Sequence, residues 1–139
     1  MITLFSRPNI LLRLEGLALL ALGLAVYAKL GYSWGLFWAL LLLPDIALLA
    51  YLLNKEVGAV AYNITHAKLL PTLLAVMAIV LGHPVAMAAA IIWFVHIGVD
   101  RFLGYGLKYT QGFKFTHLGI LGEKTCGSEK NPLPGVCGK

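Results

Sequence analysis

Four long apolar runs restrict what this chain can fold into. They cover residues 9–29, 33–53, 57–81 and 84–103. In a helix, about 20 mostly apolar residues match the roughly 30 Å of hydrocarbon in a bilayer, so each run is long enough to cross it once. None of the runs shows the apolar–polar alternation expected of membrane β-barrel strands. The sequence therefore predicts an all-α integral membrane protein with four transmembrane helices.

Composition and short connections predict how these helices are arranged. Of the 139 residues, 60% are hydrophobic and 12% are charged, whereas a soluble domain usually has about 25% charged residues. The connections are a few residues long, at Leu30–Tyr32, Asn54–Glu56 and Gly82–Pro84. Such short turns make sequential helices antiparallel neighbours. We therefore predict an up-down four-transmembrane-helix bundle within residues 1–121, with no cleavable signal peptide.

Positive charges are unevenly distributed between the two ends of the predicted helices. Lys and Arg number 11 against 6 Asp and Glu, for a formal net charge of +5. Arg7, Arg13 and Lys55 lie at one end, together with the basic residues that follow the fourth run, whereas Lys29 lies at the other. Because cytoplasmic segments of membrane proteins are enriched in Lys and Arg, both termini are predicted to be cytoplasmic. Membrane topology and contacts with anionic membrane lipids thus account for the excess of Lys and Arg over Asp and Glu, and we expect no nucleic-acid partner.

Polar and ionisable side chains lie inside all four runs, although a charge facing lipid costs about 2.5–3.5 kcal/mol on insertion scales. At 1.5 Å per residue, Asp45, His66 and His96 lie about 10–13 Å from the cytoplasmic ends of their helices. Glu15 lies about 9 Å from the start of the first helix. The other half of the bundle is almost purely apolar. We therefore predict that these groups turn inward and meet in one pocket in the cytoplasmic half.

Helical spacing supports a shared polar face. His96 and Asp100 are four residues apart and stack on one side of their helix, and Asn63 and His66, three apart, share a face of theirs. Pro44 removes a backbone N–H and loosens the second helix just before its aspartate. A His–Asp pair at this depth fits a structural role and a catalytic role equally well. The candidate catalytic residues are His66, His96, Asp100 and Asp45.

A divalent metal is a second interpretation of the same side chains. Imidazole and carboxylate groups together suit Zn²⁺, Fe²⁺ or Mn²⁺. The sequence has neither the Glu-x-x-His pairs of di-iron bundles nor an HExxH motif. The metal's identity therefore stays open, and its candidate ligands are His66, His96, Asp45 and Asp100.

The sequence after the fourth run is aromatic and basic. Across residues 104–121, tyrosines and phenylalanines alternate with lysines, a pattern typical of chain that lies in the membrane interface. If this segment folds back, it could bring His117 to the mouth of the bundle. Residues 122–139 are rich in Gly, Pro and Lys and predict a flexible tail. Its two cysteines, Cys126 and Cys137, are expected to stay reduced on the cytoplasmic side.

Three motifs carry a resemblance to a known family. They are PD at 44–45, YNITH at 62–66, and HIGVDRFLGYGLKY with FKFTHLG between 96 and 119. Over residues 11–122 the chain resembles the small bacterial membrane proteins of domain-of-unknown-function family 4260. The resemblance implies a four-helix protein of the bacterial inner (plasma) membrane, and it implies no activity. It points to these motif positions: Asp45, Asn63, His66, His96, Asp100, Arg101, Tyr105, Lys108 and His117.

Three functions fit the pattern. The first is a membrane-embedded acid–base or metal-assisted enzyme for a small apolar or lipid-like substrate, in which Asp100 orients His96. The second is a structural or accessory membrane protein whose polar network fixes helix packing. The third is a proton-coupled carrier, for which a homo-oligomer could supply the pathway that the apolar half lacks. Around the catalytic candidates, the candidate binding residues are Glu15, Asn63, Arg101, Tyr105, Lys108 and His117.

Overall fold

Six helices form four membrane-length spans in the computed structural model, which describes residues 8–107, 115–116 and 119–120. The spans are α2 (Pro8–Lys29), α3 (Trp34–Leu41) continued by η1 (Leu43–Leu52), α4 (Lys55–His66) continued by α5 (Leu69–Leu81), and α6 (Pro84–Leu103). Two-residue strands β1 (Phe115–Thr116) and β2 (Gly119–Ile120) pair antiparallel. Each span is long and apolar enough to cross a membrane, which confirms the four predicted helical spans.

The second span is not the continuous helix that we predicted for residues 33–53. The α-helix α3 ends at Leu41, and the chain continues from Leu43 as η1, a 3₁₀ helix of 10 residues. Pro44 occupies the first turn of η1 and has no N–H to donate to the preceding turn. The next N–H, that of Asp45, bonds instead to the carbonyl of Leu42, three residues back, over 3.1 Å. The loosening expected at the proline is therefore a change of helix type.

The third span, predicted as one helix over residues 57–81, is also interrupted. The helix α4 ends at His66, and Ala67 has an extended backbone with φ −82° and ψ 142°. Pro71 explains the position of this break, because in a continuous helix its ring would clash with the carbonyl four residues back, that of Ala67. The helix resumes as α5 at Leu69. Each interruption lies within three residues of a candidate site residue, Asp45 or His66.

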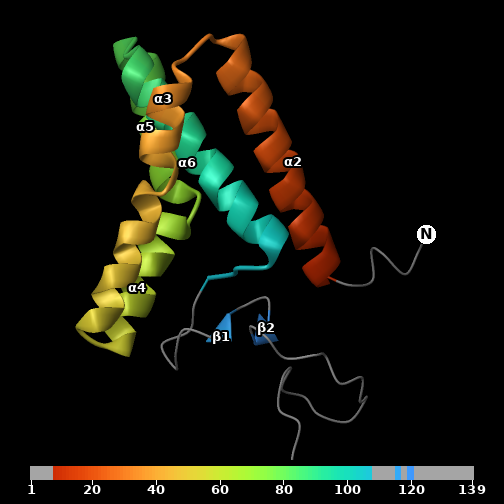
Figure 1. Ribbon diagram of the computed structural model, residues 1–139, viewed down its shortest axis with the longest axis vertical. Helices are drawn as coiled ribbons and strands as arrows, with labels where there is room; N and C mark the ends of the chain where they lie inside the picture. Colours follow the sequence, from red (N-terminus) through yellow and green to blue (C-terminus); the bar gives the residue numbers. More distant parts are fainter. Residues whose placement is uncertain (1–7, 108–114, 117–118, 121–139) are drawn as a thin grey trace, which may run out of the picture.

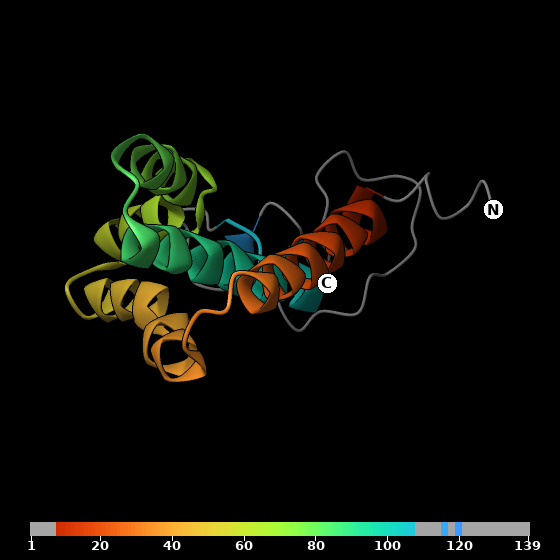
Figure 2. The same cartoon turned by 90° about the horizontal axis from the view of Figure 1, so that it is seen from above.

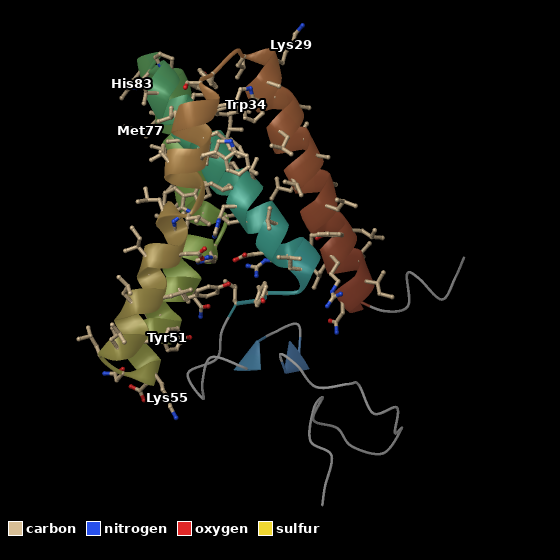
Figure 3. All side chains as sticks on the ribbon, viewed as in Figure 1. Lys29, Trp34, Tyr51, Lys55, Met77 and His83 are labelled. Carbon is tan, nitrogen blue, oxygen red and sulfur yellow. The ribbon has the colours of Figure 1, made fainter. Side chains whose placement is uncertain are left out.

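The four spans alternate in direction, as predicted for an up-down arrangement (Figure 1). Figure 3 places Lys29 and His83 at one end of the molecule and Tyr51 and Lys55 at the other. Two sequential pairs are neighbours as predicted, the second and third spans through η1 and α4 and the third and fourth through α5 and α6. The first and second spans differ from the prediction. The first span packs chiefly along α6, which also contacts α3 and α5, while η1 packs on α4. Figure 2 shows α5 and α3 on either side of α6, with α2 leading away from them.

Close contact through glycines explains why α2 packs on α6. A Cβ added to Gly98 would lie 2.8 Å from the Leu20 nitrogen and 2.9 Å from the Gly16 oxygen, so the two backbones touch there. One turn further on, a Cβ at Gly23 would lie 2.5 Å from a methyl group of Val95. Small residues allow membrane helices to approach this closely, and the gain is van der Waals contact. This contact fixes the rotation of α6, and therefore the direction of its polar side chains.

The hydrophobic core occupies the half of the bundle nearer Lys29. Tyr27 has no exposed surface, and its ring packs edge-to-face on Phe37 with centroids 5.2 Å apart. Ile92 and Val95 of α6 complete this core. The Tyr27 hydroxyl donates to the Ser33 carbonyl over 2.6 Å, so this buried polar group is hydrogen-bonded. The polar side chains of α6 begin at the next residue, His96.

Candidate functional site

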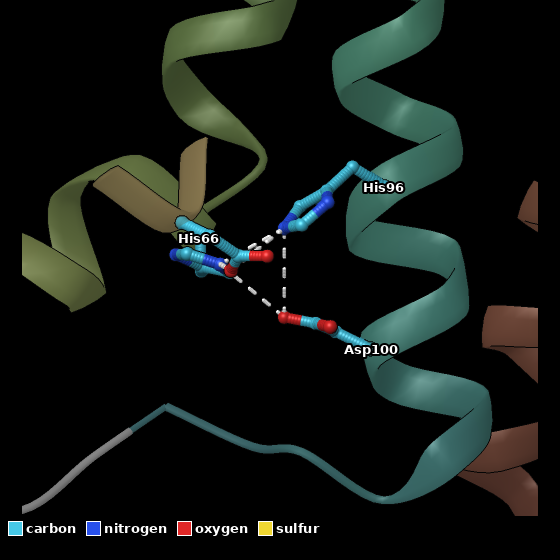
Figure 4. A group of neighbouring side chains, drawn as sticks. His66, His96 and Asp100 are labelled. Atoms are coloured by element: carbon cyan, nitrogen blue, oxygen red, sulfur yellow. Dashed lines mark hydrogen bonds and ion pairs between the residues drawn. The ribbon is translucent and has the colours of Figure 1, made fainter. Parts of the chain in front are cut away.

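Two histidines and two aspartates converge where the second and third spans are interrupted (Figure 4). The Nε2 atoms of His66 and His96 lie 3.1 Å apart. Asp45 Oδ1 lies 3.4 Å from the first of these nitrogens and 3.5 Å from the second. Asp100 Oδ2 lies 3.3 Å and 3.8 Å from them. The four donor atoms are all within 4.8 Å of one another, and we refer to the four residues as the His–Asp cluster.

These distances match the edges of a metal coordination tetrahedron. Bonds of about 2.0–2.2 Å at tetrahedral angles separate neighbouring ligand atoms by about 3.3–3.6 Å. Five of the six distances between donor atoms, 3.1–3.8 Å, span this range, and the sixth, between the two aspartate oxygens, is at most 4.8 Å. Two carboxylates so close also repel, by about 3 kcal/mol or more at an effective dielectric constant of about 20. A divalent cation at the centre would remove that repulsion and use all four atoms, so the donor set fits such a metal.

Local contacts hold the His66 ring in the orientation that a metal ligand needs. Its Nδ1 lies 3.0 Å from the carbonyl oxygen of Tyr62 and 2.9 Å from the hydroxyl of Thr65. Since a carbonyl only accepts, Nδ1 carries the proton in the neutral ring and Nε2 presents its lone pair to the cluster. The Tyr62 ring stacks on the imidazole, with centroids 3.8 Å apart and planes 13° from parallel. The His66 side chain is fully buried.

Asp100 is held more tightly than Asp45. The Tyr62 hydroxyl donates to Asp100 Oδ2 over 3.1 Å, so Tyr62 orients both His66 and Asp100. The side chain of Asp100 is 15% exposed and that of Asp45 is 37% exposed. Asp45 is therefore the ligand candidate most accessible from outside the bundle.

The interruption of the third span is satisfied by side chains of α6. The last carbonyls of a helix have no partner within it, and in a membrane an unpaired carbonyl is costly. Trp93 Nε1 donates to the Thr65 carbonyl over 2.7 Å, and Arg101 Nη2 donates to the His66 carbonyl over 3.1 Å. Arg101 Nη1 also donates to the carbonyl of Tyr105 over 2.7 Å. Arg101, predicted only as a candidate binding residue, is thus a buried positioning residue.

The structure does not bring every predicted residue to the cluster. Glu15 is exposed on α2, because the adjacent Gly16 faces α6 and successive helical residues point about 100° apart. Three spans therefore build the cluster, whereas we had predicted four. Asn63 is half-buried on α4, and Tyr105 contributes its backbone carbonyl while its side chain is 38% exposed. Two other candidates, Lys108 and His117, lie outside the described residues, as does the predicted tail 122–139.

Residues that support the cluster were missed by sequence reasoning. Thr65 and Trp93 make contacts at the break in the third span, but a threonine or tryptophan in an apolar run carries no signal of such a role. A usable signal did exist for the break itself. Pro71 lies inside a predicted helix, and its ring requires an interruption four residues earlier, next to His66.

A comparison with known proteins adds a family and no activity. The chain matches the family described as domain of unknown function DUF4260 over residues 9–121. No curated protein and no solved structure matches it. The matched range includes all four spans and every member of the His–Asp cluster. Since it covers most of the 139 residues, the chain belongs to the DUF4260 family.

Proposed function

We propose that this DUF4260 protein is a membrane-embedded metalloenzyme that acts on a small apolar or lipid-like substrate. The observation that carries the proposal is the convergence of four donor atoms from three spans, at separations suited to one tetrahedral metal ion. Two imidazole and two carboxylate ligands make Zn²⁺ the first candidate, with Fe²⁺ and Mn²⁺ as alternatives. When bound, such an ion polarises a substrate oxygen or activates a water molecule.

We assign the roles of the protein side chains from how exposed each one is. Asp45, the most accessible of the four, is the residue that we assign to proton transfer with the substrate. Asp100 and Tyr62 hold His66 and His96 in place, which fixes their nitrogen atoms before any substrate arrives. Arg101 stabilises the interrupted helix end and does not reach the reacting atoms.

We further propose that the protein lies in the bacterial inner membrane with both termini in the cytoplasm. Tyr51 and Lys55 share one end of the molecule, and Lys29 lies at the other. Arg13 and Arg101 lie near the same end as Lys55, which is consistent with the preference of Lys and Arg for the cytoplasmic side. The cluster would then be reached from the cytoplasmic half of the membrane.

Metal analysis of the purified protein tests the proposal. After purification in detergent and removal of loosely bound ions, we expect close to one Zn²⁺, Fe²⁺ or Mn²⁺ per chain. His96→Ala should abolish binding, whereas His83→Ala, an exposed histidine at the other end of α6, should leave it intact. A wild-type protein that binds none of the three ions during titration would refute the metal centre.

A structural metal site is a second candidate, and one observation favours it. All four positions of a tetrahedron are supplied by protein, as in closed structural zinc sites, whereas catalytic sites keep one position open. The cluster also joins η1 and α4 to α6. Adding azide to the Co²⁺-substituted protein separates the two roles: a catalytic site that releases Asp45 should change its visible absorption, and a closed structural site should not.

A further inference from the structure

A largely apolar cavity of about 250 Å³ lies beside the His–Asp cluster. Three of the four spans surround it: its walls come from α3 and η1, from α4 and α5, and from α6. The principal lining residues are Leu43, Pro44, Thr65, Leu74, Ala89 and Trp93. Leu43 is 55% exposed, so the cavity reaches the side of the bundle that faces lipid.

Lining residues on three elements lie next to members of the cluster, although the four cluster residues do not themselves line the cavity. Thr65 precedes His66 in the chain, and its hydroxyl lies 2.9 Å from the Nδ1 atom of that ring. Pro44 immediately precedes Asp45. Trp93 lies one helical turn before His96 on α6. One end of the cavity is therefore next to the cluster, and the remainder extends into the apolar half of the protein.

We propose that this cavity binds the hydrocarbon body of an uncharged amphiphile whose single oxygen group points to the His–Asp cluster. The inference rests on the proposed metal centre and names its substrate class. The apolar walls favour an alkyl chain or a ring, because they offer no charged group and the Thr65 hydroxyl is already hydrogen-bonded. The oxygen group belongs at the cluster, where donor and acceptor atoms are concentrated.

Charge determines the class of head group. Two carboxylates and a divalent ion sum to zero, so the cluster would have no excess positive charge to bind an anion. Arg101, the buried cation nearest the cluster in the described part of the chain, already donates to two backbone carbonyls. A carboxylate or phosphate head would be buried without a counter-ion, at high cost. An alcohol, aldehyde, ketone or ester carbonyl would not.

Volume determines the approximate size of the ligand. A protein cavity of about 150 Å³ is known to hold benzene, so about 250 Å³ corresponds to about ten heavy atoms on the same scale. A saturated alcohol of eight carbons with one bromine has that number. A longer chain would have to extend past Leu43 towards the lipid.

Trp93 makes the cavity measurable, because a bromine atom quenches the fluorescence of a tryptophan that it contacts. Trp34 and Trp38 are exposed and outside the cavity, so the variant W34F/W38F leaves Trp93 as the single reporter. We would titrate this Zn²⁺-loaded protein in detergent with 8-bromooctan-1-ol and, separately, with 1-bromooctane. We expect saturable quenching by both, with the alcohol binding about fivefold or more tightly because its hydroxyl bonds to the cluster.

Two substitutions in the same background test the location. Ala89→Leu fills the cavity and should weaken binding of the alcohol by about tenfold or more, whereas Ala25→Leu, an exposed site on α2, should not. Leu40 also lines the cavity, so Leu40→Ala enlarges it and should shift the preference to longer alcohols. It provides the test if Ala89→Leu fails to fold.

Three results would overturn the inference: quenching that does not saturate, equal affinity for the alcohol and the alkane, or equal effects of the two leucine substitutions. Strong quenching by a phospholipid with brominated acyl chains would also overturn the inference if excess octan-1-ol did not relieve that quenching. A membrane lipid would then fill the cavity. The Zn²⁺ content of every sample is measured in parallel. A cavity variant that keeps its metal but loses the alcohol separates failure of the pocket from failure of the metal centre.

Discussion

Arg101 Nη2 donates a hydrogen bond to the carbonyl oxygen of His66 over 3.1 Å, and so links the last turn of α6 to the interrupted end of α4. The guanidinium is buried, with 8% of the residue exposed, and its other terminal nitrogen donates to the Tyr105 carbonyl. Arginine suits this position because its planar group offers several donors in a fixed geometry. The backbone that carries His66 is therefore held in place by Arg101, which lies about one and a half turns after His96 on α6.

Replacing Arg101 should loosen the His–Asp cluster without removing a ligand. Arg101→Ala leaves the His66 carbonyl unpaired, which should cost about 1–3 kcal/mol of folding free energy and about 10–100-fold in metal affinity. Arg101→Lys should give intermediate values. Thermal unfolding and Zn²⁺ titration in detergent measure both quantities. Lys68→Ala is the control, since Lys68 is an exposed cation at the same helix break; an equal loss there would show that charge, and not the hydrogen bond, matters.

The two aspartates should contribute unequally to metal binding. Asp100 accepts a hydrogen bond from Tyr62 and is the less exposed of the pair, so its position is better fixed than that of Asp45. We expect Asp100→Asn to weaken Zn²⁺ binding about tenfold more than Asp45→Asn does, measured by competition with a chelator. Glu15→Gln removes an exposed carboxylate outside the cluster and should change nothing. The reverse order of the two aspartates would contradict the geometry.

Metal affinity should fall as the pH is lowered. His66 and His96 bind a metal only through unprotonated nitrogens, so protons compete with the ion as the pH falls. Two competing histidines give a decrease of up to about 100-fold per pH unit. Among the described residues, three other charged or titratable groups face the two histidines: Asp45, Asp100 and Tyr62. These groups are present whether or not the metal is bound. Zn²⁺ titrations at several pH values measure the slope, and a flat profile would exclude histidine ligation.

The contact between α2 and α6 should depend on Gly98. A methyl group there would meet the backbone of Leu20 and Gly16 at 2.8–2.9 Å, and backbone atoms cannot move aside locally. Gly98→Ala should therefore destabilise the protein by about 1–3 kcal/mol. Gly35→Ala is the matched control in another span, where the nearest atom to an added methyl is the Ser33 hydroxyl at 3.4 Å. Thermal unfolding compares the two, and equal unfolding temperatures would contradict the close packing.

Much of the candidate site could be predicted because the cost of burying a charge depends on position along a span. That argument identified Asp45, His66, His96 and Asp100, whose donor atoms do converge. The same argument included Glu15, which is exposed on α2. Depth alone does not say which way a side chain faces. The rotation of α2 about its own axis depends on the glycine contacts with α6, and these contacts join residues about 80 positions apart in the chain.

The sequence by itself determined the number of spans and their alternating direction. The length of an apolar run and the shortness of a turn are local properties of the sequence, and the bilayer thickness sets the run length that one span needs. It also contained the two helix breaks, since Pro44 and Pro71 cannot continue an α-helix through the preceding turn. Only the tertiary structure decided that the break in the third span lies beside α6, where Trp93 and Arg101 donate to the carbonyls of Thr65 and His66. A carbonyl buried in an apolar region is costly without a hydrogen-bond donor, and here long-range packing supplies that donor.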